Sequence, residues 1–342
     1  MMQTKTNLEA KEMLFALSQA FGPPGREKAI RELVRGFVSG LCDQIEEDAS
    51  GNLVAVKKGY STEKVMFSSH MDEVSLLVSR VHPEGYLRIH GIGVDPKILP
   101  SQRVHIHTRS GEVLRGVVGM LAPHLQTAES RKKVATFDDL FVDVSMADFS
   151  SVSVGDFITF DSEPFEMENV WVGKTFDDRA CCVASILALQ KLQHVEHPAT
   201  VYAVFSSREE IGAMGAKTAA HWIQPDVAIA LDATHGNDFS PGYEKIEVGK
   251  GPAIGFGPVL SPDIFAQLQS VASQNNIPYQ FEACPGRTGT DADQIQLEGI
   301  RCGLISVPLR YMHTPFEMIQ EKDLKEAARL LSSWVSQYRK ER

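Results

Sequence analysis

Two adjacent carboxylates, Glu209 and Glu210, directly follow an apolar run that predicts a strand. A strand that ends in paired acids and leads into a small-residue helix start places both acids at the carboxyl edge of a sheet, where α/β proteins build their sites. Because the side chains of neighbouring residues point in different directions, one acid can hold a metal ion while the other accepts a proton. The pair alone is weak evidence, since the helix dipole also favours acids at solvated helix starts.

Four further segments carry ligand-competent side chains at the edge of a predicted element. A histidine that ends a strand, with a carboxylate two residues on, can bind a metal and have its imidazole oriented by that carboxylate. Together the segments supply nitrogen and oxygen donors, a mixed set that suits zinc, cobalt or manganese. The side chains are His70, Asp72, Asp177, Asp178, Asp232 and His313.

Each of these residues also has an ordinary structural explanation. A single aspartate at a strand end is more often a turn or helix-cap residue, and a single histidine is more often a hydrogen-bonded surface or core residue. Five element edges that all carry such side chains, with no serine nucleophile elbow among them, are hard to obtain by chance. The joint pattern therefore favours one metal site.

The order of these motifs resembles the glutamyl aminopeptidase family of dinuclear metallopeptidases, which includes the tetrahedral deblocking aminopeptidases and proteins labelled endoglucanase M. The likeness runs nearly from end to end of the chain. Its site motifs are residues 70–73, 177–179, 209–212, 231–232 and 310–313, and residues 93–96, 123–125, 249–252 and 289–292 resemble signatures of the family that hold no metal.

The resemblance implies two divalent metal ions per subunit, zinc or cobalt, bridged by Asp177. It implies that His70 and Asp232 complete the site of one ion, and that Glu210 and His313 complete the site of the other. The implied arrangement is physically reasonable, because a bridging carboxylate can hold two cations about 3.5 to 4 Å apart and a shared water then becomes a hydroxide nucleophile near neutral pH.

Two catalytic roles follow from the same resemblance. Glu209 is the expected general base, and Asp72 is expected to hold the imidazole of His70 in one tautomer. Two departures from the family pattern concern substrate preference: many relatives have glutamine where Arg208 stands, and residues 255–262 lack an acid that close relatives carry.

Composition limits the other possibilities. A chain of 342 residues with 43% hydrophobic content can bury a large core in one or two domains. A net charge of −10 with no long basic run argues against nucleic acid as a partner. The sequence has no apolar run of membrane-spanning length and no secretory start, and its five cysteines form no CxxC pair. We therefore expect a cytoplasmic protein without a membrane partner.

Periodicity predicts an α/β catalytic domain, residues 1–72 and 168–342, and an inserted all-β domain, residues 73–167. The resemblance implies that the catalytic domain has a mixed-sheet, zinc-peptidase-like fold. The insertion contains short alternating segments bounded by turn residues, which predict antiparallel strands. The resemblance implies that the insertion mediates homo-oligomerisation, with a dodecamer as one known form. Amphipathic helices are predicted over residues 26–42 and 323–339, the second capped by Asp323.

The sequence thus predicts an aminopeptidase that removes amino-terminal residues from peptides. One alternative is a dinuclear amidohydrolase acting on N-acyl amino acids, and another is a non-catalytic binding or shell protein of the same fold. A glycosidase is disfavoured, because glycoside hydrolysis needs a pair of carboxylates free to act on the sugar, and here the obvious acids are committed to metal.

Overall fold

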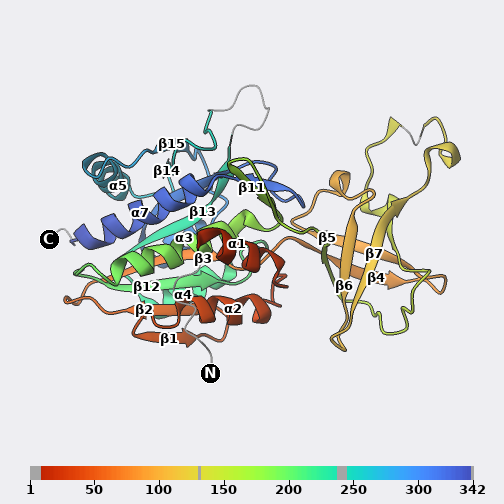
Figure 1. The fold of residues 1–342 in the computed structure, drawn as a ribbon, viewed down its shortest axis with the longest axis horizontal. Helices are drawn as coiled ribbons and strands as arrows, with labels where there is room; N and C mark the ends of the chain where they lie inside the picture. Colours follow the sequence, from red (N-terminus) through yellow and green to blue (C-terminus); the bar gives the residue numbers. More distant parts are fainter. Residues whose placement is uncertain (1–8, 130–131, 237–244, 340–342) are drawn as a thin grey trace. The chain divides into compact units, whose positions relative to one another are not determined.

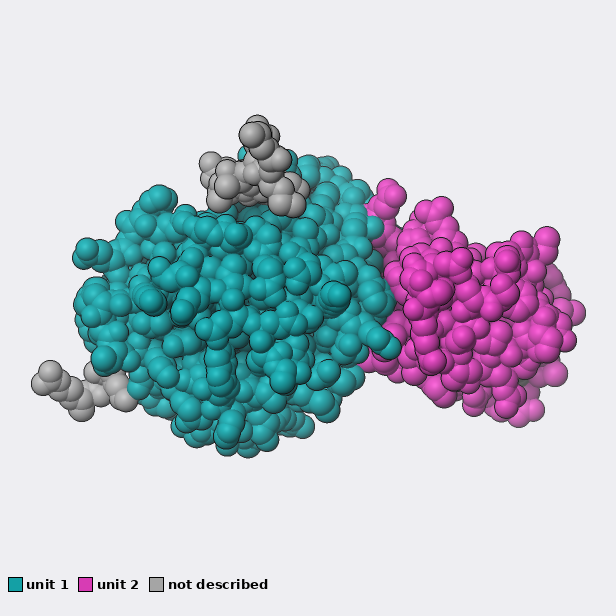
Figure 2. Space-filling view, turned by 90° about the horizontal axis from the view of Figure 1, so that it is seen from below, with its two compact units in different colours: residues 1–73, 164–312, 316–342 teal, residues 74–163, 313–315 magenta. Residues whose placement is uncertain are grey.

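A computed structural model of the protein describes residues 9–129, 132–236 and 245–339 (Figure 1). The chain divides into two compact units, one of residues 1–73, 164–312 and 316–342 and the other of residues 74–163 and 313–315 (Figure 2). The first unit is a mixed α/β structure and the second is a closed, antiparallel β-barrel. The predicted fold class, an α/β domain with a separate all-β insertion, is confirmed.

The first unit is built on an eight-stranded mixed sheet. Its strands are β1 (Gln44–Glu47), β2 (Leu53–Lys57), β3 (Lys64–His70), β12 (Thr200–Ser206), β13 (Val227–His235), β14 (Ala253–Phe256), β15 (Gln280–Ala283) and β16 (Arg301–Leu309). The order across the sheet is β1-β2-β12-β3-β13-β16-β14-β15. The four central strands β12, β3, β13 and β16 are parallel, and antiparallel pairs join them to the flanking strands.

Helices cover both faces of this sheet. Successive side chains of β3 enter opposite cores, with Val65 and Phe67 in one hydrophobic cluster and Met66 in the other. The described helices are α1 (Ala10–Gln19), α2 (Lys28–Val38), α3 (Phe176–Leu192), α4 (Met214–Ile223), α5 (Pro262–Gln274), α6 (Ala292–Ile295) and α7 (Glu321–Gln337). The first cluster contains residues of α1, α2, α3, α5 and α7, and the second contains residues of α4 and α6. The central strands are continuous apolar runs because both of their faces are buried.

Both predicted amphipathic helices are present, as α2 and α7, but the predicted cap of α7 is wrong. The residue before this helix is Gln320, and Asp323 lies inside its first turn. The buried Asp323 carboxylate instead accepts hydrogen bonds from the backbone N–H groups of Gly249 and Gly251, at 2.5 and 2.7 Å. Within the described ranges, no helix has the length and hydropathy needed to cross a bilayer.

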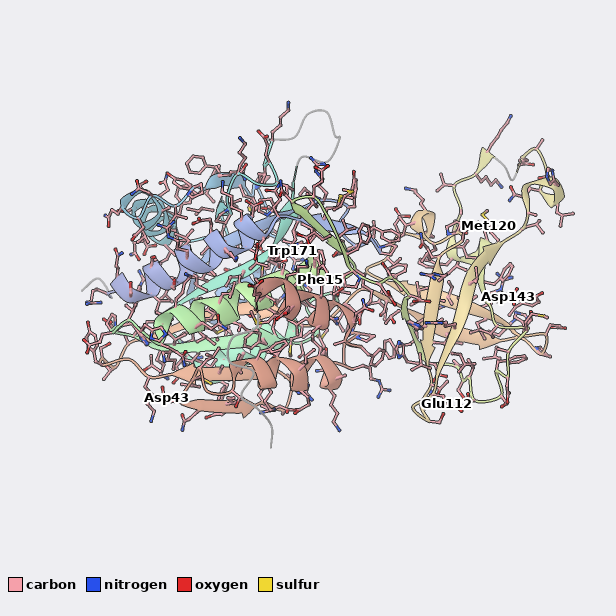
Figure 3. All side chains as sticks on the ribbon, viewed as in Figure 1. Phe15, Asp43, Glu112, Met120, Asp143 and Trp171 are labelled. Atoms are coloured by element: carbon pink, nitrogen blue, oxygen red, sulfur yellow. The ribbon has the colours of Figure 1, made fainter. Side chains whose placement is uncertain are left out.

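A second, small sheet lies in the same unit. It consists of the antiparallel strands β10 (Phe165–Met167), β11 (Val170–Gly173) and β17 (Glu317–Ile319). Trp171 of β11 packs against Phe15 of α1 in an edge-to-face contact, with ring centroids 6.2 Å apart (Figure 3). This contact joins the small sheet to the helical layer.

The barrel forms the second unit. Its strands are β4 (Ser75–Val81), β5 (Tyr86–Ile92), β6 (Arg103–His107), β7 (Val113–Met120), β8 (Leu140–Asp143) and β9 (Phe157–Phe160), in the order β4-β5-β8-β7-β6-β9. Closure leaves no free strand edge. The barrel has its own core, with Val78, Leu87, Val104, Ile106 and Val142 fully buried. Short 3₁₀ helices are η1 (Pro96–Ile98), η2 (Pro123–Leu125) and η4 (Phe137–Asp139) here, and η5 (Gln296–Glu298) in the first unit.

The loop between β12 and α4 depends on a close approach at Gly215. The side chain of Asn52 donates to the Gly215 carbonyl at 2.8 Å and accepts from the Ser207 N–H at 2.9 Å. A Cβ at Gly215 would lie 2.3 Å from both the Asn52 Oδ1 atom and the Ser207 carbonyl oxygen. The loop is therefore packed too tightly for any larger residue.

We predict that Gly215→Ala lowers the free energy of unfolding by about 1 to 3 kcal/mol, because backbone atoms must move to admit the methyl group. Urea denaturation measures the effect. The matched control is Gly36→Ala: Gly36 is exposed in α2 and an added Cβ meets nothing within 4 Å, so this variant should be unchanged or more stable by about 0.5 to 1 kcal/mol. Equal stability of the two variants would contradict the prediction.

Candidate metal centre

The side chains singled out in the sequence meet at the carboxyl ends of the central parallel strands. His70 is the last residue of β3 and pairs in register with Ser206, the last residue of β12. Glu209 and Glu210 follow β12 in the loop before α4, and Asp232 lies in the neighbouring strand β13. Parallel strands end at the same edge of a sheet, so the topology brings residues from distant parts of the chain together.

Two groups of metal-competent side chains share one carboxylate. His70, Asp177 and Asp232 form the first group, and Asp177, Glu210 and His313 form the second. In each group, one possible ligand atom per residue lies within 4.8 Å of the others. The first group is buried, whereas Glu210 and His313 are half-buried. The structure thus brings the five side chains together, and their role as ligands remains a prediction.

The imidazole of His70 is held on both sides. Its Nε2 atom lies 3.2 Å from Asp177 Oδ1, and its Nδ1 atom lies 3.2 Å from the carbonyl oxygen and 3.5 Å from the Oδ1 atom of Asp72. The backbone N–H of His70 donates to Asp178 Oδ2 at 3.0 Å. Burial alone would lower the pKa of His70, but hydrogen bonds with Asp177 and Asp72 outweigh it and raise the pKa well above its usual value.

Asp72 also positions the loop that carries the paired acids. Its fully buried carboxylate accepts the backbone N–H of Glu209 on Oδ1 at 3.0 Å and that of Glu210 on Oδ2 at 3.1 Å. The Glu209 Oε2 atom then lies 3.9 Å from His70 Nε2. One carboxylate therefore orients a histidine and fixes two neighbouring acids, although the sequence suggested only the first role.

The site concentrates buried negative charge. Burial raises the pKa of Glu209 to about 8, and burial followed by nearby carboxylates raises the pKa of Asp178 and of Asp232 well above the usual value. Asp178 follows Asp177 through a cis peptide bond, and its buried Oδ1 atom has no hydrogen-bond partner in the described part of the chain. Crowded, buried carboxylates repel one another unless cations compensate them. The donor set therefore fits divalent cations.

A buried ion-pair network holds the backbone next to the site. Glu73 accepts from Lys174 Nζ at 2.6 Å and from Arg179 Nη2 at 3.2 Å. Burial alone would raise the pKa of Glu73, but the charges of Lys174 and Arg179 lower it. Arg179 also donates to the carbonyl groups of Leu17, at 2.5 Å, and Met71, at 3.2 Å. The network ties the start of α3 to α1 and to the loop after β3.

Sequence reasoning assigned no role to two further buried acids. Glu317 Oε2 accepts the backbone N–H of Asp177 at 3.1 Å, and Asp291 Oδ2 accepts the hydroxyl groups of Ser68 and Ser206 at 2.5 and 2.6 Å. Asp291 belongs to residues 289–292, which resemble a family signature that holds no metal. The only signal for Glu317 was a single acid among apolar residues in a short strand. Their partners lie far away in the sequence, so residue spacing does not reveal them.

Comparison with known proteins places this arrangement in the aminopeptidase class of hydrolases. The family model described as M42 glutamyl aminopeptidase matches residues 51–330, and the chain belongs to this family.

Similar proteins match nearly the whole chain. The lysyl aminopeptidase of Pyrococcus furiosus is 34% identical over 340 residues, which cover 95% of this chain and 96% of that protein. The structure of aminopeptidase APDkam598 from Desulfurococcus kamchatkensis matches with a TM-score of 0.89 and 35% identity, over 96% of this chain and 95% of that one. The TET1 peptidase of Pyrococcus horikoshii, described as assembling into a tetrahedron or a large octahedral shell, matches with a TM-score of 0.85 and 29% identity, over 96% and 100%.

Proposed function

We propose that the protein is a metal-dependent aminopeptidase that removes amino-terminal residues from peptides. The observation that carries the proposal is the pair of acid–histidine groups that share Asp177, next to Glu209, in a chain of an aminopeptidase family. Two divalent ions, zinc or cobalt, would supply Lewis acidity and lower the pKa of a water molecule when bound there. In this proposal His70 and Asp232 hold one ion, Glu210 and His313 hold the other, and Asp177 holds both.

Glu209 acts as the general base in the proposed reaction. Its backbone is fixed by Asp72 and its carboxylate faces His70, so it lies beside a side chain that we propose holds the first ion. It accepts a proton from the attacking water and returns the proton to the leaving amine. In this scheme the carboxylate of Asp72 orients the imidazole of His70 and positions the loop of Glu209 and Glu210, and it moves no proton itself.

Electrostatics favour a substrate with a free amino terminus. Two divalent ions would compensate the ligand carboxylates, and Glu209 and Asp178, which lie outside both ligand groups, are then the carboxylates that can receive an ammonium group. An N-acyl substrate offers no such charge. Binding of the ammonium group to these carboxylates also orients the peptide, because its amino end then lies at the acids and the rest of the peptide points away from them.

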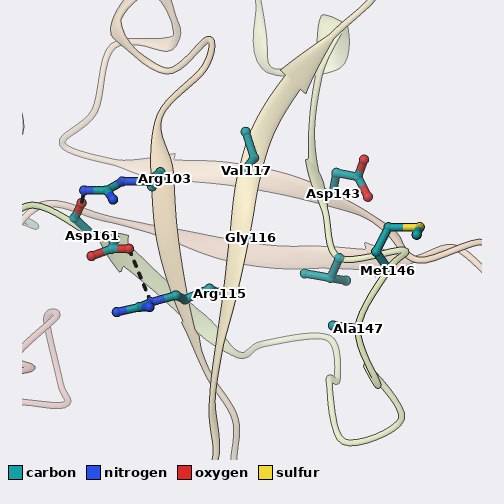
Figure 4. A pocket seen from close by; sticks show the side chains of 9 residues that line it. Arg103, Arg115, Gly116, Val117, Asp143, Met146, Ala147 and Asp161 are labelled. Carbon is teal, nitrogen blue, oxygen red and sulfur yellow. Dashed lines mark hydrogen bonds and ion pairs between the residues drawn. The ribbon is translucent and has the colours of Figure 1, made fainter.

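We further propose that the barrel mediates homo-oligomerisation, with a dodecamer as one possible form. A hollow of about 370 Å³ is lined by residues of the barrel. Figure 4 shows the side chains that line it. Asp161 Oδ2 lies 3.5 Å from Arg115 Nε in this hollow, and Val117 and Met146, which are 49% and 98% exposed, also line it. Exposed apolar side chains beside an ion pair are typical of protein interaction surfaces.

The thiol groups support a cytoplasmic location. All five cysteines are free, and four of them are buried. Unpaired cysteines are typical of a reducing compartment.

Our metal prediction concerns stoichiometry. After loading with zinc or cobalt, elemental analysis should find two ions per chain. Asp177→Ala should lose both ions, because this carboxylate belongs to both groups, whereas His70→Ala or His313→Ala should lose about one. Lys191→Gln, an exposed change on α3, is the control and should keep both. No more than one ion in the loaded wild type would count against the proposal.

A second prediction concerns Glu209→Gln. This variant should keep its metal, because Glu209 is in neither ligand group, but lose roughly 10² to 10⁴ in kcat through loss of proton transfer. Glu196→Gln, an exposed change of the same chemistry, should keep full activity. Near-normal turnover of Glu209→Gln with confirmed metal content would remove Glu209 from the mechanism.

The direction of attack is the third prediction and tests the function itself. Mass spectrometry of a short, unblocked peptide should show a ladder shortened from the amino end, and the N-acetylated peptide should stay intact. A ladder from the carboxyl end, or cleavage of N-acyl amino acids alone, would indicate an amidohydrolase or carboxypeptidase instead. Absence of any turnover in the metal-loaded protein would indicate a non-catalytic protein of this fold.

A further inference from the structure

A cavity of about 640 Å³ lies in the first unit, beside the loop that carries Glu209. Its walls come from the segment before and within α2, from the turn between β1 and β2, and from Arg208. Phe21 and Gly25 form part of the wall, and Arg208 directly precedes Glu209 in the chain. Because consecutive Cα atoms are about 3.8 Å apart, the Cα atom of Arg208 in the cavity wall lies this close to the Cα atom of the proposed base Glu209.

The acids of the cavity already have partners. Glu27 Oε1 accepts the backbone N–H groups of Gly25 at 2.7 Å and Arg208 at 3.2 Å. Asp48 Oδ1 accepts the backbone N–H of Asn52 at 3.0 Å, and Asp48 Oδ2 accepts the side-chain amide of the same residue at 2.6 Å. These carboxylates are therefore engaged by the protein's own donors.

The remaining two acids belong to an ion-pair network on α2. Glu47 accepts from Arg31 Nη2 at 2.8 Å and from Arg35 Nη2 at 2.9 Å, and Glu32 Oε1 lies 3.3 Å from Arg35 Nε. Arg31 also donates to a backbone carbonyl. The carboxylates thus neutralise Arg31 and Arg35, and none of them lies within ion-pair distance of the Arg208 guanidinium group. The charge of Arg208 acts on the nearby Glu27, whose pKa is raised by burial and lowered in part by backbone hydrogen bonds and by Arg208.

The guanidinium group of Arg208 forms no hydrogen bond or ion pair with any residue that the structure describes. The side chain is half-buried and lies over Gly25, where an added Cβ would meet Arg208 Nε at 3.6 Å. The backbone of Arg208 is left-handed, with φ of 58°, a conformation that residues other than glycine rarely adopt. Such outliers cluster at binding and catalytic sites, where the fold holds a side chain in a required direction.

We propose that Arg208 binds a carboxylate of the peptide substrate and that the cavity holds the residues that follow the cleaved bond. The proposal rests on the proposed aminopeptidase function. A guanidinium group binds a carboxylate through two parallel hydrogen bonds, so an unpaired, half-buried arginine is suited to this ligand. The carboxylate is either the carboxyl terminus of a short peptide or an acidic side chain beyond the first residue.

The two charged regions orient the substrate together. The carboxylates outside the two ligand groups receive its ammonium group, and Arg208, which directly precedes Glu209, attracts its carboxylate. A short peptide is a dipole with opposite charges at its ends, so this arrangement binds it in one direction. The expected substrates are short peptides with a free carboxyl terminus, or peptides with an acidic residue after the first.

Kinetics on matched peptides test the assignment. Let X be the amino-terminal residue that the enzyme removes fastest. The substrates are then X-Ala, the carboxyl-terminal amide of X-Ala, and X-Glu amide. Arg208→Gln should lower kcat/KM roughly 10- to 100-fold on a carboxylate substrate, mainly through KM, and less than about 3-fold on X-Ala amide. A loss on X-Ala identifies the carboxyl terminus as the ligand, and a loss on X-Glu amide identifies an acidic side chain.

Two further variants separate binding from general damage. Arg208→Lys keeps the charge but not the two parallel donors, so its loss should be intermediate. Arg80→Gln removes the same charge from an exposed position on β4 and should change no substrate selectively. Equal loss on the carboxylate and amide substrates in Arg208→Gln would overturn the proposal.

A binding measurement distinguishes this proposal from the proposed function. Isothermal titration compares Ala-Ala with its amide on the metal-loaded wild type and on Arg208→Gln. If the wild type binds Ala-Ala more tightly than its amide, and Arg208→Gln does not, the assignment of Arg208 is supported. This result supports the assignment even if no peptide is turned over. In that case only the proposed aminopeptidase function fails. If the wild type binds Ala-Ala and its amide equally, the carboxyl terminus of the peptide is not the ligand of Arg208. The kinetics on X-Glu amide then decide whether an acidic side chain of the peptide is the ligand.

Discussion

Repulsion between buried carboxylates is the constraint on which the rest of this structure depends. Asp177, Asp178 and Asp232 are buried close together, and burial raises the pKa of Glu209 to about 8. Like charges at such distances destabilise the folded state unless cations or hydrogen bonds compensate them. The surrounding backbone holds these acids in place, and the acids and the two histidines form a donor set that fits divalent cations.

The neighbouring polar contacts supply that support. Asp72 fixes the loop of Glu209, Glu317 fixes the backbone at Asp177, and Glu73 pairs with Lys174 and Arg179 below the site. None of these contacts is exposed to solvent. Removing one partner of a buried ion pair leaves an uncompensated charge and typically costs about 3 to 5 kcal/mol, so the network is a rigid support.

The sheet and its helices place the polar site and the apolar core in different parts of the first unit. The parallel strands place the acids and histidines at one edge, while the helical layers on both faces bury the apolar strands. Arg208 is next to the paired acids in the chain. Its side chain lies over Gly25 and forms part of the wall of a cavity. A single loop after β12 therefore carries both the proposed base and the arginine that we propose binds a carboxylate of the peptide.

The sequence by itself determined the fold class, the apolar central strands and the side chains that meet in the site. Strand and helix periodicity are local, and ligand-competent residues at the ends of such elements can be recognised from spacing alone. The prediction for α7 failed at Asp323, because a nearby turn before β14 competes for its carboxylate.

Only the tertiary structure decided which side chains group with Asp177, how Glu317 and Asp291 support the site, and that no residue of the described ranges pairs with the Arg208 guanidinium group. The contacts of Glu317 and Asp291 join segments that are 140 and 85 residues apart in the chain. Local spacing carries no information about such contacts, since the strand order of the sheet sets them. His313 illustrates the same limit, because it lies in a turn after β16 with φ of 61° and reaches Asp177 only through the fold.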